Sequence, residues 1–162
     1  MVEVKRNKYA GILANDMADG EGVCVSFWVQ GCPIHCPGCH NHQTWDFEGG
    51  LDLPLNYLDL IDQAISANGV HRNFSLLGGE PLSAKNLELS YTILKHVRSK
   101  FPSIKIFCWT GYTLESLSPE QRKCLQFIDT LIDGPYIQEQ RDITLKLRGS
   151  TNQKIRQKGV DF

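Results

Sequence analysis

A chain of 162 residues with 41% hydrophobic and 22% charged side chains has the composition of a protein that buries a core. This length favours one compact domain, which we expect to span residues 1–162. The net charge of −1 gives no strong field to attract nucleic acid or a membrane surface. No stretch of about 18 apolar residues predicts a membrane span, and the first residues lack the apolar run of a secretion signal. We therefore expect a cytoplasmic protein.

The β-branched and aromatic run Val23–Val29 predicts a buried strand. A weaker strand is expected before it, over Tyr9–Leu13. A long loop, Gln30–Gly50, follows the strand predicted over Val23–Val29. Apolar residues at i, i+3 and i+7 within residues 54–67 then predict a helix, which should end near Gly69. These apolar residues are Leu58, Ile61 and Ile65.

Asn73–Leu77 is expected to form a short strand that ends at two glycines. Ser83 is the predicted N-cap of a helix that continues to about Ser99. Ile104–Trp109 should be the next strand, after Pro102. The apolar face of the helix is expected to consist of Leu87, Tyr91, Leu94 and Val97.

Ser118–Gln121 has the pattern of a capping box with proline at the first helical position, which predicts a short helix. Phe127–Ile132 is expected to be the last strand, and the polar tail Tyr136–Phe162 shows no clear pattern. The alternation of strands and helices predicts an α/β fold with parallel pairing. A complete eightfold barrel usually needs about 250 residues, so we expect a partial, open β/α barrel whose open side is covered by a large partner or a second copy.

Three cysteines, Cys32, Cys36 and Cys39, lie within eight residues in the spacing C-x3-C-x2-C. Such crowding in a cytosolic chain indicates metal binding rather than disulfides. A [4Fe–4S] cluster normally takes four cysteine ligands, so three would leave one iron free. An open metal position is typical of catalytic sites. The remaining cysteines are expected to be small buried side chains, and one of them as a remote ligand is the weaker alternative: Cys24, Cys108 and Cys124.

A structural zinc site is an alternative for the same loop. A nearby histidine would supply the fourth ligand of a Cys3His site. The histidines in reach along the chain are His35, His40 and His42, and each of them is equally compatible with a solvated loop position.

Gly78-Gly79-Glu80-Pro81 is the second signal, directly after a predicted strand. Glycines there let a ligand approach the backbone closely, and carbonyl and carboxylate oxygens accept hydrogen bonds from an ammonium group. The alternative is a simple turn, which Gly-Gly and proline often form. The cysteine loop and the Gly-Gly-Glu-Pro turn both follow predicted parallel strands, and barrel enzymes place their active sites in such loops.

These motifs together resemble the radical S-adenosylmethionine (SAM) superfamily, and most closely the family of activating proteins of anaerobic ribonucleoside-triphosphate reductase. The wider superfamily has an aromatic residue before the third cysteine, whereas this chain has Gly38, as the narrower family commonly does. The similar blocks run in family order over nearly the whole chain: residues 27–32, 39–41, 44–45, 77–82, 109–112, 132–136 and 148–153.

The resemblance implies an enzyme that cleaves SAM reductively and abstracts a hydrogen from a glycine of the partner reductase, leaving a glycyl radical. It implies a [4Fe–4S] cluster and SAM as cofactors, an electron donor such as flavodoxin, and no catalytic side chain beyond the cluster ligands. His40 or a later aromatic residue is expected against the adenine. The implied site residues are Cys32, Cys36 and Cys39 on the cluster, Gly78, Gly79 and Glu80 around the SAM amino group, and Gly38, Cys39 and His40 along the nucleoside.

The basic residues of the tail have two interpretations, either docking of the reductase or contact with the SAM carboxylate. Arg148 is favoured because it lies in a family-like block, whereas the others are as easily solvated: Lys154, Arg156 and Lys158. Two other functions stay open. One is a different small radical SAM enzyme, such as another glycyl-radical activase or a 7-carboxy-7-deazaguanine synthase. The other is a non-enzymatic zinc or iron–sulfur module.

Overall fold

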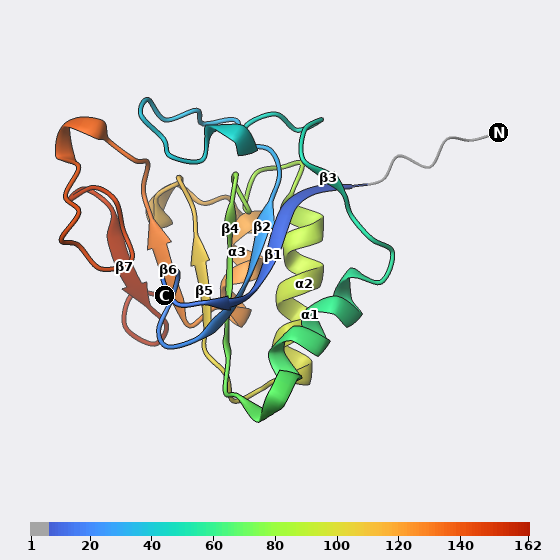
Figure 1. Ribbon diagram of the computed structural model, residues 1–162. Helices are drawn as coiled ribbons and strands as arrows, with labels where there is room; N and C mark the ends of the chain where they lie inside the picture. Colours follow the sequence, from blue (N-terminus) through green and yellow to red (C-terminus); the bar gives the residue numbers. More distant parts are fainter. Residues whose placement is uncertain (1–6) are drawn as a thin grey trace.

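Residues 7–162 are described by a computed structural model, and they form a mixed α/β fold around one open sheet (Figure 1). Within these residues the sheet has seven strands in the order β3-β1-β2-β4-β5-β6-β7. The strands are β1 (Lys8–Asp16), β2 (Cys24–Val29), β3 (Leu51–Asp52), β4 (Asn73–Gly78), β5 (Ile106–Trp109), β6 (Thr130–Asp133) and β7 (Lys154–Gln157). The α-helices are α1 (Tyr57–Ser66), α2 (Leu87–Lys100) and α3 (Pro119–Arg122).

The four central strands, β2, β4, β5 and β6, pair in parallel. The outer strands pair antiparallel, since β1 joins β2 and β3, and β7 joins β6. The predicted α/β class and the lack of closure are confirmed. The expectation of parallel pairing holds only for the centre, because residues 17–23 turn the chain back from β1 into β2, and the longer segment 134–153 brings β7 along β6 in the opposite direction.

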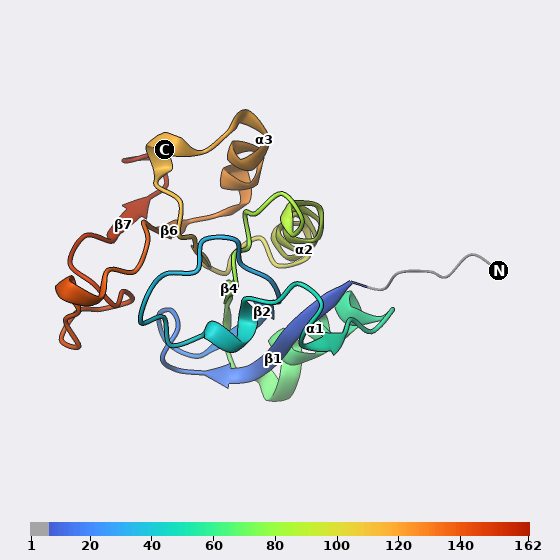
Figure 2. The ribbon, with the colours of Figure 1, turned by 90° about the horizontal axis from the view of Figure 1, so that it is seen from above.

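The three α-helices cover one face of the sheet, and residues 138–153 lie on the other (Figure 2). Alternate strand residues such as Phe27, Leu76 and Ile106 are fully buried in the core under the helices. Helix α1 contributes Ile61 and Ile65 to the same core, as their spacing predicted. Each such side chain contributes about 1.5–3 kcal/mol through burial. No helix within residues 7–162 is long and apolar enough to cross a lipid bilayer.

The predicted N-cap of the second helix is wrong. Helix α2 begins after Asn86 rather than at Ser83, and the buried Ser83 hydroxyl has no hydrogen-bond partner within residues 7–162. The intervening segment is tied down by tertiary contacts, since the Asn86 side-chain amide donates to the carbonyls of Gly31 (3.1 Å) and Glu80 (3.0 Å). These bonds hold residues 81–86 as a turn and delay the start of the helix.

The predicted capping box is confirmed. The Ser118 hydroxyl accepts a bond from the Gln121 backbone N–H (3.2 Å), and the Gln121 side chain accepts one from the Ser118 N–H (2.8 Å). Pro119 occupies the first helical position of α3. Both signals are local, which is why the sequence alone reveals them.

Strand β7 lies in the tail that showed no clear pattern, so the strand expected over Phe127–Ile132 is not the last. That strand is the shorter β6, and Phe127 lies in a 3₁₀ turn before it. Arg156 of β7 donates from Nε to both carboxylate oxygens of Asp133 (3.2 Å each) and from Nη2 to Glu115 (2.8 Å). The side chain of Asp133 is only 2% exposed. Arg156 is therefore a structural residue rather than a free docking charge.

Removing this cation should destabilise the protein. Arg156→Met leaves the buried Asp133 carboxylate without its charged partner, so we expect the free energy of unfolding to fall by about 3 kcal/mol. Lys123→Met is the control, because its pair with Glu120 is exposed and should contribute less than about 1 kcal/mol. Urea unfolding monitored by circular dichroism measures both, and equal effects of the two variants would contradict the assignment.

Candidate functional site

A cavity of about 440 Å³ lies beneath the cysteine loop, at the carboxyl ends of the parallel strands. Figure 1 shows this loop across the top of the sheet, over the ends of β2, β4 and β5. Gly38 is not on the cavity wall; it packs against Gln138, where an added Cβ would come within 2.3 Å of the amide oxygen. The other predicted site residues all line the cavity: Cys32, Cys36, Cys39, His40, Gly78, Gly79 and Glu80.

The cysteine loop folds back on itself through backbone hydrogen bonds. The Gly31 N–H donates to the Thr44 carbonyl (2.7 Å), and the Cys32 N–H donates to the Trp45 carbonyl (3.0 Å). Gly31 has a φ of +105°, and a Cβ there would lie 2.0 Å from the Phe47 ring. Only glycine fits this start of the loop, so the position of Cys32 depends on it.

The three loop thiols are free and partly exposed, and each is approached by a backbone N–H group. Such donors stabilise the thiolate over the thiol and are typical of sulfur ligands to iron. The donors are the N–H groups of Ile34 and His35 at Cys32, of Tyr136 at Cys36, and of Asn41 at Cys39. Because one donor comes from residue 136, the loop is also linked to the segment that follows β6.

Burial raises the pKa of the Cys32 thiol and of the Cys36 thiol, although the backbone donors act in the opposite direction. Metal binding must therefore displace protons from these groups. No three His, Cys, Asp or Glu side chains of residues 7–162 converge on the position of a single metal ion. In a cluster each cysteine binds a different iron, so three free thiols around one cavity fit an iron–sulfur cluster with three protein ligands.

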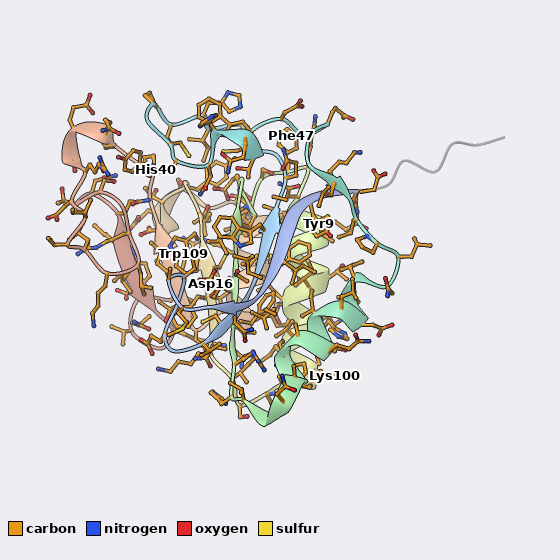
Figure 3. The ribbon with its side chains drawn as sticks, in the orientation of Figure 1. Tyr9, Asp16, His40, Phe47, Lys100 and Trp109 are labelled. Atoms are coloured by element: carbon orange, nitrogen blue, oxygen red, sulfur yellow. The ribbon has the colours of Figure 1, made fainter. Side chains whose placement is uncertain are left out.

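The loop histidines lie in different surroundings. His35 stacks on Trp45 with ring centroids 4.5 Å apart, and His42 meets the edge of the same ring. His40 lines the cavity, and its ring centroid is 5.9 Å from that of Tyr136. His40 belongs to the cysteine loop, and Figure 3 shows it above Trp109. Of the three, His40 is the one placed to contact a bound ligand.

The glycines of the second motif are required by the neighbouring chain. Gly78 has a φ of +116°, and a Cβ there would lie 2.6 Å from the backbone of Val29. A Cβ on Gly79 would lie 2.3 Å from the Gly31 carbonyl oxygen. Their small size lets the Gly79 N–H donate to Val29 (2.9 Å) and the Glu80 N–H donate to Gly31 (2.8 Å). The Gly-Gly-Glu loop and the cysteine loop therefore form one unit.

Glu80 is 1% exposed and accepts three hydrogen bonds through its carboxylate. The donors are the Leu82 N–H (2.8 Å), the Thr110 hydroxyl (2.8 Å) and the Gly111 N–H (2.6 Å). Burial raises the pKa of Glu80 to about 7, and the three donors oppose this shift. A buried carboxyl with this pKa gains its charged form when a cation approaches.

The tail closes the other wall of the cavity. The Trp109 indole N–H donates to the Leu147 carbonyl (2.6 Å). Arg148 lines the cavity and donates from Nη1 to the Gln153 carbonyl (2.7 Å). Its buried Nε has no hydrogen-bond partner within residues 7–162. A buried N–H without a partner is costly, and Arg148 is the one Lys or Arg on the cavity wall formed by residues 7–162.

Asp19 on the cavity wall and the adjacent Asp16 were not found by sequence reasoning. Oδ1 of Asp16 accepts bonds from the N–H groups of Ala18 (2.9 Å) and Asp19 (3.1 Å), while Oδ2 lacks a partner within residues 7–162. The Asp19 side chain lies next to this carboxylate, and a proton on it would supply a donor. Burial and the adjacent Asp16 raise the pKa of Asp19 to about 7. The spacing Asp-x-x-Asp before a glycine was the available signal, and it also fits an ordinary turn.

Comparison with known proteins points to one family. The family model described as "4Fe-4S single cluster domain" matches residues 18–156. A Haemophilus influenzae protein named anaerobic ribonucleoside-triphosphate reductase-activating protein is 38% identical over 152 residues, which cover 91% of this chain and 96% of that protein. Proteins of the same name from Vibrio cholerae (37% over 141 residues; 86% and 91% covered) and Enterobacteria phage T4 (34% over 148 residues; 91% and 92% covered) are also similar.

The Asp16–Asp19 pair predicts how stability depends on pH. The pKa of Asp19 rises from 3.8 to about 7 on folding, so between these values the folded protein holds a proton that the unfolded chain has lost. Stability contributed by this proton is therefore lost as the pH rises from about 4 to about 7. Asp19→Asn cannot ionise, so its free energy of unfolding should decline less steeply than that of the wild type over this range.

Asp142→Asn provides a control that acts outside this pH range. Hydrogen bonds from Thr144 lower the pKa of the partly exposed Asp142 below its ordinary value of 3.8, so the stability that it adds is gained below about pH 4. Its replacement should leave the decline between about pH 4 and about 7 as steep as in the wild type. Urea unfolding of the metal-free protein at several pH values measures both slopes, and a wild-type slope in Asp19→Asn would rule out the shared proton.

Proposed function

This chain belongs to the family of anaerobic ribonucleoside-triphosphate reductase-activating proteins, and from this premise we propose that it generates the glycyl radical of such a reductase. The observation that carries the proposal is the arrangement of Cys32, Cys36 and Cys39. Their free thiols face one cavity, and each receives a backbone N–H group. The chain offers no further cysteine on the cavity wall formed by residues 7–162, which leaves a metal position for SAM.

The sheet supports a radical SAM type of fold. Four parallel strands carry helices on one face, and the cavity opens at their carboxyl ends, where β/α enzymes place their sites. We propose that this is a partial β/α barrel whose antiparallel outer strands end the sheet before it closes.

The chain's own residues bind and orient the reactants. When bound, a [4Fe–4S] cluster supplies the electron that splits SAM into methionine and a 5′-deoxyadenosyl radical, which removes a hydrogen from the target glycine. Cys32, Cys36 and Cys39 would hold the cluster, and the cysteine loop would exclude water from above. The carbonyls of Gly78 and Gly79 would accept bonds from the SAM amino group. Glu80 would attract the same ammonium and hold the loop that presents these carbonyls.

The nucleoside of SAM is proposed to lie beside Cys39 and His40, with His40 or Tyr136 against the adenine. Gly38 is assigned to the same side through its backbone. Its φ of +79° and its packing on Gln138 hold the turn between the second and third cysteines, so its contribution is to place Cys39.

The partners follow from the same chemistry. The protein substrate is the glycine-bearing segment of the reductase, and the electron is proposed to come from a small carrier such as flavodoxin. Both are consistent with a cytoplasmic location, which is part of the proposal.

The function is tested by anaerobic reconstitution with iron and sulfide, followed by reduction in the presence of SAM and a reductase. We expect 5′-deoxyadenosine and an organic radical signal on the reductase. Cys36→Ala should lose bound iron, cluster absorbance and SAM cleavage together, because the loop then has only two thiolates. Cys124→Ala is the control, since this fully buried cysteine lies outside the cavity and should retain iron.

Three outcomes would contradict the proposal. The first is full SAM cleavage by Cys36→Ala, which would remove the ligand assignment. The second is zinc bound in place of iron, or a cluster that does not react with SAM, which would favour a non-enzymatic module. The third is a small-molecule product with no radical on the reductase, which would favour another radical SAM enzyme.

Arg148 is proposed to bind the carboxylate of SAM, because it is the one Lys or Arg on the cavity wall formed by residues 7–162. Arg148→Gln should raise the KM for SAM about tenfold, which corresponds to the loss of one charged hydrogen bond, and should leave the iron content unchanged. Lys154→Gln is the matched control, since Lys154 is exposed and lies off the cavity wall. An unchanged KM in Arg148→Gln would contradict the assignment, and the alternative of docking would then predict a change in the KM for the reductase.

A further inference from the structure

A second cavity, of about 450 Å³, lies along β1 and shares a wall with the first. Trp28 and Thr44 line both cavities. We call the second cavity the β1 groove. Its lining consists of Ala10, Gly11 and Leu13 of β1, Trp28 and Gln30 at the end of β2, and Gln43, Thr44 and Gly50 of the cysteine loop. The β1 groove therefore lies next to the cavity of the cysteines, with Trp28 and Thr44 between them.

The face of β1 that lines the groove is apolar and open. Tyr9 and Ile12 pack against the core under the helices, so Gly11 and Leu13 point to the opposite face. Gly11 lies directly across from Trp28, and a Cβ added to Gly11 would meet nothing within 4 Å. Leu13 is 51% exposed. This face offers a shallow surface without a side chain in its middle.

The outer edge of β1 is also available. Strand β3 pairs only with Lys8 and Tyr9, so the outer side of residues 10–16 faces no strand within residues 7–162. Pairing with β2 is regular from Gly11 to Leu13 and irregular on either side. Residues 9–15 carry no charge, although edge strands are commonly protected by charged side chains. An extended peptide can add to such an edge through main-chain hydrogen bonds.

We propose that the β1 edge and the β1 groove bind an extended, uncharged segment of the reductase next to its target glycine. This inference rests on the proposed function. A glycine has no side chain by which it can be held, so its segment must be bound through the main chain and the flanking residues. Strand addition to Gly11–Leu13 provides those contacts, and the groove places the segment beside Trp28 and Thr44, which also line the cavity of the cysteines. The target glycine must reach the cavity of the cysteines, so its flanking segment, rather than a second copy of this chain, is the occupant that a groove next to that cavity fits.

Gly11→Leu tests the groove with little risk to the fold, because Gly11 has no positive φ and its Cβ position is free. With subsaturating reductase we expect the rate of glycyl radical formation to fall at least about tenfold, as when a central interface position is blocked. SAM cleavage without reductase should stay at the wild-type rate. Val70→Trp, at an exposed position outside both cavities, should leave both rates unchanged.

Hydrogen exchange provides a readout that does not require turnover. The amides of residues 10–13 should exchange more slowly when the reductase is bound to the reconstituted wild type, and this protection should be lost in Gly11→Leu. Unchanged exchange together with a wild-type radical rate in Gly11→Leu would overturn the inference and leave the proposed function intact. If the wild type forms no radical, the proposed function fails, and absent protection would then reject the groove as well. Protection that grows with the concentration of this chain alone would assign the edge to a second copy and also overturn the inference.

Discussion

The buried carboxyl of Glu80 joins the loops that build the reaction cavity. Its carboxylate accepts bonds from Leu82, Thr110 and Gly111, and its backbone N–H donates to Gly31. These contacts connect the carboxyl ends of β2, β4 and β5. An ionised carboxylate is costly to bury unless it is hydrogen-bonded. The fold must therefore keep the donors of Leu82, Thr110 and Gly111 in contact with the Glu80 carboxylate. With a pKa of about 7, this group can both hold the loops and respond to the ammonium of an incoming ligand.

Elements with locally determined structure were predictable from the sequence. The β-branched run before the cysteines forms β2, the i, i+3, i+7 spacing forms α1, and the Ser118–Gln121 capping box forms as expected. The cysteine spacing and the Gly-Gly-Glu turn were also visible as chemistry. In each case the signal lies within a few residues, where propensity and periodicity operate.

The features that were missed depend on residues far apart in the chain. Strand β7 is formed by pairing with β6, and its Arg156 binds Asp133, 23 residues earlier, whereas the tail showed no pattern of its own. Helix α2 starts late because Asn86 is held by Gly31, 55 residues earlier. The reason for the glycines at 78 and 79 was also hidden, since the space they leave is taken by Val29 and Gly31. Tertiary contacts of this kind override local propensity.

The open sheet and the protein substrate have a common explanation. A closed barrel would surround its reactants with its own strands, whereas here the parallel centre ends in antiparallel β1 and β7. Residues 138–153 cover the cavity from the side of β7 (Figure 2), so the wall at β1 is the side left for a large reactant. In β1 no charged residue lies between Lys8 and Asp16, and Gly11 has no side chain. The β1 side of the open sheet is thus where an extended segment of a protein substrate can add to it.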